Sequence, residues 1–361
     1  MDFYDCGAYV EINAAHMEYN AKTIISAVSV PVIAVLKCDG YGTGLLHAAK
    51  IWKSAGAKMF AVSDGRDALR LRDAGFDDDI LLLSPVVNAP LAEKLIQNGV
   101  ILSIDSRKTA DFYSSFQKHP IRVHIAVDTG LGRFGFKYTD KSSIPEIYRD
   151  YPFNVEGIYS HFSASFEKKY SVTKTQLDRF QSLTRGLEQC GITVGMRHIA
   201  NSAAALRFLD TQLDAVRVGS ALVGRLCCKT SVNLRRIGIG KAPVIALKSV
   251  QAGDSVGYGG AYRVRKSCTA AIVAVGYGSG FGTARSFDYP AFIDALRGIK
   301  NVISRHFNPP SVRINGGTAY PIGRIAACNT LFDVDGLNVN IGDIAEFECD
   351  IMHNKLPRKY I

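Results

Sequence analysis

Short apolar runs alternate with segments of helical periodicity along the first two thirds of the chain. The run Ala8–Ile12 predicts a first strand, and the amphipathic pattern from Asn13 to Val28 predicts a helix. The short apolar runs that follow, β-branched in part, are typical of strands buried in a parallel sheet. These strands are expected at Val32–Leu36, Met59–Val62, Ile80–Leu83, Val100–Ile104, Val123–Val127, Val155–Ser160, Met196–Ala200 and Ala215–Gly219, with helices between them, for example at Gly65–Ala74, Ala89–Asn98 and Thr173–Cys190.

These strand units, separated by helices, predict a parallel (β/α)8 barrel of the TIM type. An open, doubly wound sheet is the alternative, but no G-x-G-x-x-G turn follows the first strand. After residue 235 the pattern changes to short strands separated by Gly, Asp and Asn turns, which predicts a C-terminal all-β domain. Its strands are expected at Val244–Val250, Ser255–Tyr262, Cys268–Val275, Val312–Ile314 and Ile344–Cys349.

The expected division of the chain is a barrel over residues 1–235 and a β domain over residues 236–361. A length of 361 residues fits two domains. The first strand, near residues 8–12, is a candidate to pair with the β domain. The segment 288–307 is either an inserted helix or a long loop.

The composition is that of a globular protein with a large core, since 47% of the residues are hydrophobic and 21% are charged. No apolar run approaches the roughly 20 residues that a membrane helix needs, and the N-terminus has no signal-peptide pattern. The eight cysteines are scattered and contain no CxxC pair. We therefore expect reduced thiols in a cytoplasmic enzyme, rather than a disulfide framework or a metal site.

The formal net charge of +10 would suit either a nucleic acid or small anions. Because the Lys and Arg residues are dispersed and form no stripe along a helix, we expect no nucleic-acid partner. A generally positive field also attracts small molecules that carry a phosphate or a carboxylate. The charge therefore favours an anionic small-molecule ligand.

Lys37 stands at the carboxyl end of the strand Val32–Leu36 and is followed by glycine at every other position, Gly40, Gly42 and Gly44. In α/β folds the carboxyl ends of strands carry the chemistry. A lysine there, flanked by apolar neighbours, can have its pKa lowered by burial and act as an amine nucleophile or a base. The alternative is a lysine that leaves the strand for solvent.

Three further segments place polar side chains after expected strands. Arg133 lies in the glycine-rich segment Asp128–Gly135, where its planar donor fork suits a carboxylate or a phenolic oxygen. His161 ends another strand, and a structural histidine is the alternative there. Ser202 follows the strand Met196–Ala200, where a hydroxyl and backbone N–H groups can bind phosphate. Alternatively, this serine is only the N-cap of a helix, and the two roles are compatible.

The motif Lys37-x-x-x-Tyr41-Gly42-x-Gly44 resembles the pyridoxal-phosphate (PLP) signature of the alanine racemase family, whose members are PLP enzymes of fold type III. Further segments match the family in its order, so the resemblance spans nearly the whole chain and is weakest over residues 276–361. It implies that Lys37 holds PLP covalently. The residues implied to bind the cofactor are Lys37, Tyr41, His161, Ser202, Arg217, Gly219 and Ser220.

The resemblance places Arg217 against the pyridine nitrogen of PLP, with His161 bonded both to this arginine and to a catalytic tyrosine. A guanidinium is a permanent cation that cannot protonate the ring nitrogen, so the ring is a poorer electron sink. A short-lived carbanion favours return of the proton to Cα over transamination or elimination.

The resemblance also implies a second catalytic base, Tyr258, which the partner subunit of a homodimer donates, so that the active sites lie at the interface. Racemisation needs a base on each side of Cα, because a single group tends to return the proton that it removed. Lys37 would serve the D face and Tyr258 the L face. Both groups have pKa values near 10 in water and must be lowered to act near neutral pH.

Departures from the family pattern concern the substrate. Ala126 occupies a position where the family commonly has a lysine, often carbamylated, so another group must position Arg133. Arg133 and the backbone of Ala327 are implied to bind the substrate carboxylate. Cys328 and Asn354 stand where the family has an aspartate and often a tyrosine, which predicts a roomier or more polar pocket than alanine needs.

The sequence therefore predicts a PLP-dependent amino-acid racemase, an isomerase that interconverts L- and D-alanine by a two-base mechanism. A racemase of serine or of another larger amino acid is an alternative. A fold-related PLP decarboxylase and a non-catalytic PLP-binding homologue are further alternatives. The expected partners are an amino-acid substrate and a second copy of the chain, with no nucleic acid and no membrane segment in this chain.

Overall fold

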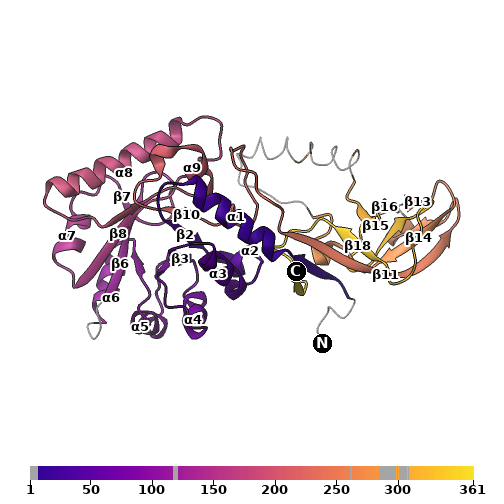
Figure 1. Ribbon diagram of the computed structural model, residues 1–361, viewed down its shortest axis with the longest axis horizontal. Coiled ribbons are helices and arrows are strands. Elements are labelled where there is room, and N and C mark those ends of the chain that lie inside the picture. Colours follow the sequence, from indigo (N-terminus) through magenta and orange to yellow (C-terminus); the bar gives the residue numbers. More distant parts are fainter. Residues whose placement is uncertain are drawn as a thin grey trace. The chain divides into compact units, whose positions relative to one another are not determined.

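The computed structural model describes residues 7–116, 121–260, 262–283, 298, 300, 307 and 309–361. The chain divides into two compact units, Ala14–Ile237 and a second unit made of Met1–Asn13 and Gly238–Ile361 (Figure 1). Nearly all of the segment 288–307, expected as a helix or a loop, lies outside the described residues. No helix in the described part of the chain is long and apolar enough to cross a membrane.

The first unit contains, within its described residues, a ring of eight parallel strands: β2 (Val32–Val35), β3 (Met59–Val62), β4 (Ile80–Leu82), β5 (Leu102–Ile104), β6 (Ile121–Asp128), β8 (Phe153–Tyr159), β9 (Met196–His198) and β10 (Val216–Val218). A bridge between Leu81 and Ile101 joins β4 to β5, and β10 pairs with β2. The Arg217 N–H donates to the Ala200 carbonyl (2.9 Å) and links β9 to β10. The predicted (β/α)8 barrel is confirmed.

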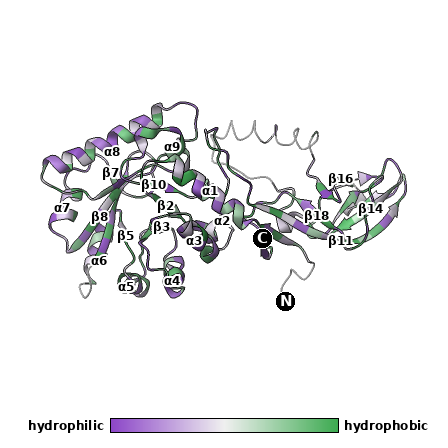
Figure 2. Cartoon of the chain, viewed as in Figure 1, coloured by the Kyte–Doolittle hydropathy of each residue, from purple (hydrophilic) through white to green (hydrophobic). Residues whose placement is uncertain are grey.

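The helices between these strands are α1 (Ala14–Ala27), α3 (Leu45–Ser54), α4 (Gly65–Asp73), α5 (Ala89–Gln97), α6 (Arg107–Ser114), α7 (Ser143–Arg149), α8 (Ser171–Gln189) and α9 (Ser202–Arg207). Polar side chains cap several of them. The Asp64 carboxylate accepts from the Arg66 N–H before α4, and the Asn88 side chain accepts from the Leu91 N–H before α5. Hydrophilic and hydrophobic residues alternate along α8 (Figure 2), because one face of this helix is buried.

The centre of the barrel is apolar. Every residue of β2 and β3 is buried, because helices cover the outer face of the sheet while the inner face points into the barrel. The residues of the central cluster are Ile33, Val35, Met59, Ala61, Leu81, Ile101 and Ala215. These side chains fill the part of the barrel interior enclosed by β2, β3, β4 and their neighbours.

The second unit is an antiparallel β structure made of β1 (Tyr9–Ile12), β11 (Gly238–Val250), β14 (Cys268–Val273), β15 (Val312–Ile314), β16 (Gly317–Pro321), β17 (Thr330–Asp333), β18 (Ile344–Phe347) and β19 (Arg358–Tyr360). Pairing of β11 with β14 closes the strands from β14 through β17, β16, β15 and β18 to β11 into a ring. The N-terminal strand β1 pairs antiparallel with β11 and parallel with β19. The predicted all-β C-terminal region is therefore present.

One expected strand of this unit is wrong. The segment Ser255–Tyr262 forms two short strands and a turn: β12 (Ser255–Val256), η2 (Tyr258–Gly260) and β13 (Tyr262–Arg263). Gly257, Gly259 and Gly260 have φ values of 82°, 69° and 61°. These left-handed conformations turn the chain at a place where its apolar residues suggested continuous extension.

The close packing of Gly240 in β11 gives a first testable prediction. A Cβ atom at Gly240 would overlap the ring of Phe347, which is fully buried and packs against Phe281. Gly240→Ala should therefore destabilise the protein by about 1–3 kcal/mol in denaturant unfolding. The control is Gly186→Ala on α8, where nothing lies within 4 Å and a gain of roughly 0.5–1 kcal/mol is expected. Equal losses in the two variants would contradict the assigned packing.

Candidate active site

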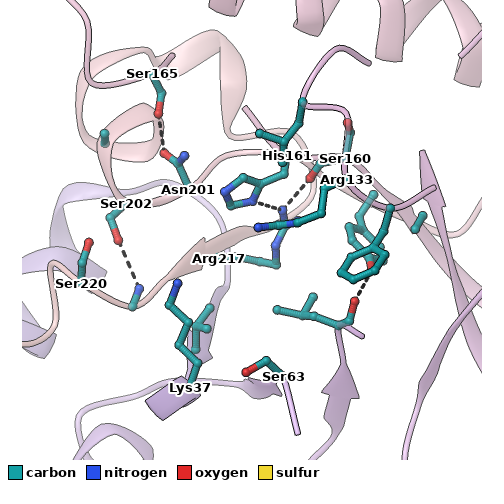
Figure 3. Close-up of a pocket in the computed structure, with 18 of the residues that line it drawn as sticks. Lys37, Ser63, Arg133, Ser160, His161, Ser165, Asn201, Ser202, Arg217 and Ser220 are labelled. Atoms are coloured by element: carbon teal, nitrogen blue, oxygen red, sulfur yellow. Dashed lines mark hydrogen bonds between the residues drawn. The ribbon is translucent and has the colours of Figure 1, made fainter. Parts of the chain in front are cut away.

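A cavity of about 370 Å³ opens at the carboxyl ends of the barrel strands. Eight of the ten predicted site residues line it: Lys37, Tyr41, Arg133, His161, Ser202, Arg217, Gly219 and Ser220. Figure 3 shows the Lys37 amine pointing into the cavity, with Ser202 and Ser220 on one side and Arg217 on the other. A cavity of this size, with few polar groups converging on it, is typical of small-molecule sites.

A left-handed turn follows Lys37 directly. Cys38 and Asp39 have φ and ψ values of 52° and 51°, and 53° and 52°, while Gly40 and Tyr41 also have positive φ (64° and 56°). Each non-glycine residue in this region costs roughly 1–2 kcal/mol. The Asp39 carboxylate accepts a hydrogen bond from the Leu45 N–H (2.9 Å) and holds the turn. The sequence did not predict this conformation, because Cys38 and Tyr41 disfavour it and only Gly40 and, less strongly, Asp39 accept it.

The turn places the Tyr41 side chain inside the cavity. Its ring centroid lies 5.5 Å from the Lys37 Nζ, and its hydroxyl lies so close to Gly219 that a Cβ there would overlap it. Burial raises the pKa of Tyr41 above its ordinary value. Tyr41 therefore stays protonated at neutral pH and can donate a hydrogen bond to an anion.

Ser202 and its neighbours form a group of hydrogen-bond donors beside this tyrosine. The Ser202 Oγ accepts from the Gly219 N–H (3.1 Å), which leaves the hydroxyl proton for another acceptor. Asn201 caps α9 by accepting from the Ala204 N–H (3.1 Å). Hydroxyl groups and backbone N–H groups gathered in this way suit a phosphate.

The guanidinium of Arg217 is buried at the opposite side of the cavity from Ser202. Its Nη1 donates to the Nδ1 and the carbonyl of His198 (2.6 and 3.0 Å). Its Nη2 donates to the carbonyl of Ser160 (2.5 Å) and to Nδ1 of His161 (3.2 Å). Burial lowers the pKa of Arg217 to about 10, so the side chain keeps its charge at neutral pH.

The proton positions on His161 follow from this arginine. A guanidinium has no acceptor, so Nδ1 of His161 must accept and Nε2 must carry the proton. Burial, together with the charges of Arg217, Arg133 and Lys37, lowers the pKa of His161 to about 3. His161 is therefore a neutral imidazole whose N–H faces away from Arg217.

The loop that carries Arg133 is held by the Asp128 carboxylate and by close packing at Ala126. The Asp128 carboxylate accepts from the N–H groups of Gly130, Leu131 and Gly132 (2.9, 2.9 and 3.1 Å). Gly135 packs against the backbone of Ala126, where a Cβ would come within 2.8 Å. Arg133 itself is exposed and lies over the Phe134 ring at 5.8 Å.

The two remaining predicted residues, Tyr258 and Ala327, belong to the β unit and are not among the residues that line the barrel cavity. Tyr258 is 98% exposed. Ala327 is exposed, and its carbonyl accepts from the Gly278 N–H (2.9 Å). Asn354 is half-buried, and its amide bonds to the Asp350 carbonyl (2.8 Å) and the Leu356 N–H (3.1 Å), so it is engaged by the backbone.

Several residues that line the cavity were not predicted as site residues from the sequence. They are Ser63, Leu83, Ser84, Phe134, Tyr159, Ser165, Phe166, Asn201, Leu226 and Cys227, among others. Ser63 and Ser84 lie just beyond the ends of β3 and β4, so the rule that led to Lys37 could have found them. Phe166 and Cys227 lie in loops without any motif. Within the described residues, no group of three or more His, Cys, Asp or Glu side chains could hold a metal ion.

The chain thus has the features of a barrel enzyme for a small anionic ligand: a lysine, a buried arginine and a group of anion-binding donors at the carboxyl end of a parallel barrel. Two family models match the chain: alanine racemase, N-terminal domain, over residues 12–226, and alanine racemase, C-terminal domain, over residues 240–354. The chain belongs to the alanine racemase family, as predicted, and with it to the isomerases.

Individual relatives agree with this assignment. The alanine racemase of Methanococcus maripaludis is 30% identical over 350 residues, which cover 93% of this chain and 87% of that protein. The alanine racemase of Desulforamulus reducens is 32% identical over 355 residues, which cover 94% and 86%. The fold matches the alanine racemase structures of Clostridium difficile 630 (TM-score 0.86, 22% identity, covering 98% and 96%) and of Bacillus anthracis with bound L-Ala-P (0.83, 24%, 100% and 96%).

The left-handed turn after Lys37 predicts that a substitution by glycine increases the stability of the protein. Cys38→Gly should stabilise the protein by about 0.5–1 kcal/mol in denaturant unfolding, because glycine adopts the observed φ of 52° without steric cost. The control is Cys268→Gly in β14, an extended position where glycine should destabilise by a similar amount. A loss of stability in Cys38→Gly would show that the turn carries no such strain.

Buried neutral histidines predict a loss of stability in acid. Burial and Arg217 lower the pKa of His124 to about 3 and that of His198 well below its ordinary value, as for His161. The unfolded chain binds these protons below pH ~6.5, so stability that is complete above that pH falls as the pH drops toward ~3. Each histidine contributes up to about 1.4 kcal/mol per pH unit.

Denaturant unfolding between about pH 7 and pH 4 measures this slope. The variant His124→Asn lacks one titrating imidazole, so its stability should fall less steeply with decreasing pH. An unchanged slope would show that His124 does not gain a proton on unfolding.

Proposed function

We propose that this protein is a PLP-dependent amino-acid racemase that acts on alanine, with one catalytic base from each subunit of a homodimer. The observation that carries the proposal is the buried, charged guanidinium of Arg217, which shares one cavity with the Lys37 amine. Membership of the alanine racemase family and the racemase names of the relatives support it.

The residues of the cavity fit PLP. Tyr41, Ser202, Gly219 and Ser220 supply hydroxyl and N–H donors for a phosphate. The Lys37 amine can bond covalently to an aldehyde carbon. When bound, PLP supplies an electron sink that makes the Cα proton of an attached amino acid acidic. Arg217 offers only hydrogen-bond donors, so it would hold the ring nitrogen without protonating it, which favours return of the proton to Cα.

Two bases would exchange that proton. Lys37 would act on the D face and Tyr258 of the partner subunit on the L face, since racemisation needs a base on each side. Tyr258 is 98% exposed at a hairpin tip, as a residue that enters another chain must be before assembly. His161 would donate its Nε2–H to the phenol oxygen and so stabilise the phenolate, with Arg217 holding the imidazole.

Substrate binding would rest on Arg133 and on the backbone of Ala327, which we propose as the carboxylate site. The exposed positions of Ala327 and Cys328 leave a larger amino acid, such as serine, as the second candidate substrate. The bonds of the Asn354 amide to the backbone argue against that residue alone making the pocket polar. A cytoplasmic location completes the proposal.

The test is incubation of the purified, PLP-loaded protein with single enantiomers of each amino acid, followed by chiral chromatography. We expect alanine to reach equal amounts of its two enantiomers, and borohydride to attach the cofactor to Lys37, located by peptide mass spectrometry. Loss of the substrate carboxylate would identify a decarboxylase. A protein that binds PLP but leaves every amino acid unchanged would identify a non-catalytic homologue, and either result would overturn the proposal.

Replacement of Tyr258 separates the two bases. Tyr258→Phe should slow racemisation by about 100- to 10,000-fold and abolish solvent-deuterium exchange from L-alanine, while exchange from D-alanine continues through Lys37. Exchange into each enantiomer, followed by mass spectrometry, measures this. The control is Tyr262→Phe, which removes a hydroxyl from the same hairpin. Equal loss of exchange from both enantiomers would contradict the face assigned to Tyr258.

A further inference from the structure

A pair of hydrogen-bonded histidines lies behind Arg217, inside the barrel. Nε2 of His198 and Nδ1 of His124 are 2.9 Å apart, and Nδ1 of His198 accepts from Arg217 at 2.6 Å. Both imidazoles are buried, with exposures of 0% and 2%, and neither lines the cavity. Neither ring is therefore placed to touch a substrate, although both belong to the hydrogen-bonded chain that ends at the catalytic arginine.

The barrel is irregular beside His124, in its strand pairing and in its neighbouring glycine. The pairing of β6 with β8 shifts register between Val123 and His124. On β8, a Cβ at Gly157 would meet the Cε1 and Nδ1 atoms of His124 at 2.7 and 2.9 Å. A polar ring in an apolar interior is unfavourable unless its hydrogen bonds are made. The His124 ring therefore lies where the strand pairing is irregular and where the neighbouring residue has no Cβ atom.

The chain of donors fixes every proton along it. Arg217 has no acceptor, so Nδ1 of His198 must accept and its proton must sit on Nε2. That N–H needs a buried acceptor, and Nδ1 of His124 is the group that it meets. Without this acceptor, the alternative tautomer of His198 would turn an N–H toward Arg217 and displace the guanidinium from its place.

The plane of the His198 ring is also set. Tyr159 stacks on His198 with centroids 5.2 Å apart and an angle of 12°, and it also lies 5.1 Å from the Arg217 guanidinium. The ring can therefore change the position of its proton more easily than its orientation. Nδ1 therefore stays opposite Arg217, and the group bonded to Nε2 determines whether Nδ1 carries the proton.

We propose that His124 is a positioning residue for the reaction: through His198 it holds the tautomer that keeps Arg217 aimed into the cavity. Arg217 and His161 are the groups through which it acts, so its catalytic effect rests on the function proposed above. Its effect on the tautomer of His198 is a property of the chain without cofactor. The two can therefore be tested separately.

The direct test is two-bond ¹H–¹⁵N correlation spectroscopy of the cofactor-free protein labelled with ¹⁵N-histidine, with His198 assigned by a His198→Asn variant. We expect His198 to carry its proton on Nε2 in the wild type and in His124→Asn, whose side-chain oxygen replaces the Nδ1 acceptor. His124→Leu should mix or reverse the tautomers. A wild-type His198 protonated on Nδ1 would overturn the proposal whether or not the protein is a racemase.

Kinetics supply the second test. His124→Leu should lower kcat by about 10- to 100-fold with a smaller change in KM, because Arg217 would be displaced from the reacting group. His124→Asn should restore most of the rate. Gly157→Ala would press on the His124 ring and equally on the Met196 backbone carbonyl, so its loss of kcat supports the proposal only when the tautomer of His198 changes as well.

The structural control is Thr184→Val on α8, which removes a buried hydroxyl that donates to the Gln181 carbonyl, a bond outside the histidine chain. It should lose stability without losing kcat. If His124→Leu matches this control in kcat, His124 has only a structural role and the proposal is wrong. If the wild type has no racemase activity, the proposed function fails, and the tautomer measurement still decides the role of His124.

Discussion

The burial of one positive charge governs the arrangement of the barrel's active end. A guanidinium taken out of water is costly unless acceptors surround it, and Arg217 finds them in the ring and carbonyl of His198, the carbonyl of Ser160 and the ring of His161. These acceptors come from the ends of β8 and β9, so the charge is satisfied only when β8, β9 and β10 lie side by side. Neutral imidazoles around the guanidinium keep a single charge in this interior. Fold and chemistry thus depend on the same contacts.

On the other side of the cavity, the positions of Lys37 and Tyr41 depend on a strained backbone turn. The left-handed turn after Lys37 carries three non-glycine residues, Cys38, Asp39 and Tyr41, of which only Asp39 has a side chain suited to this conformation. It persists because Asp39 bonds to Leu45 and because Tyr41 fits against Gly219. Strained backbone of this kind is commonly kept where it positions reactive groups. Here it sets a tyrosine hydroxyl beside the lysine amine within a few residues of sequence.

Periodicity was sufficient to predict the barrel, because β2, β3 and β4 are short, fully apolar runs and helical patterns separate the parallel strands. It was less informative in the β unit, where Gly317–Pro321 begins with glycine and ends with proline, and Arg358–Tyr360 is polar. Ten candidate residues were predicted from the family resemblance and from the rule that parallel strands carry chemistry at their carboxyl ends. Eight of the ten line one cavity. The family resemblance implied the bond between His161 and Arg217. The pairing of His198 with His124 could not be predicted, since no local pattern tells which residues of β6 and β9 point inward at the same level. The assignment of roles to these residues remains a prediction.

The position of β1 in the β unit has a consequence for synthesis of the chain. This strand is synthesised before the barrel, yet its partners β11 and β19 both follow the barrel in the sequence, so it cannot join its sheet until the barrel residues have been made. The barrel, whose residues lie between these partners, can assemble while the ribosome is still working. Completion of the β unit therefore follows synthesis of the barrel, and until then the unpaired edge of β1 is a place where nascent chains can associate wrongly.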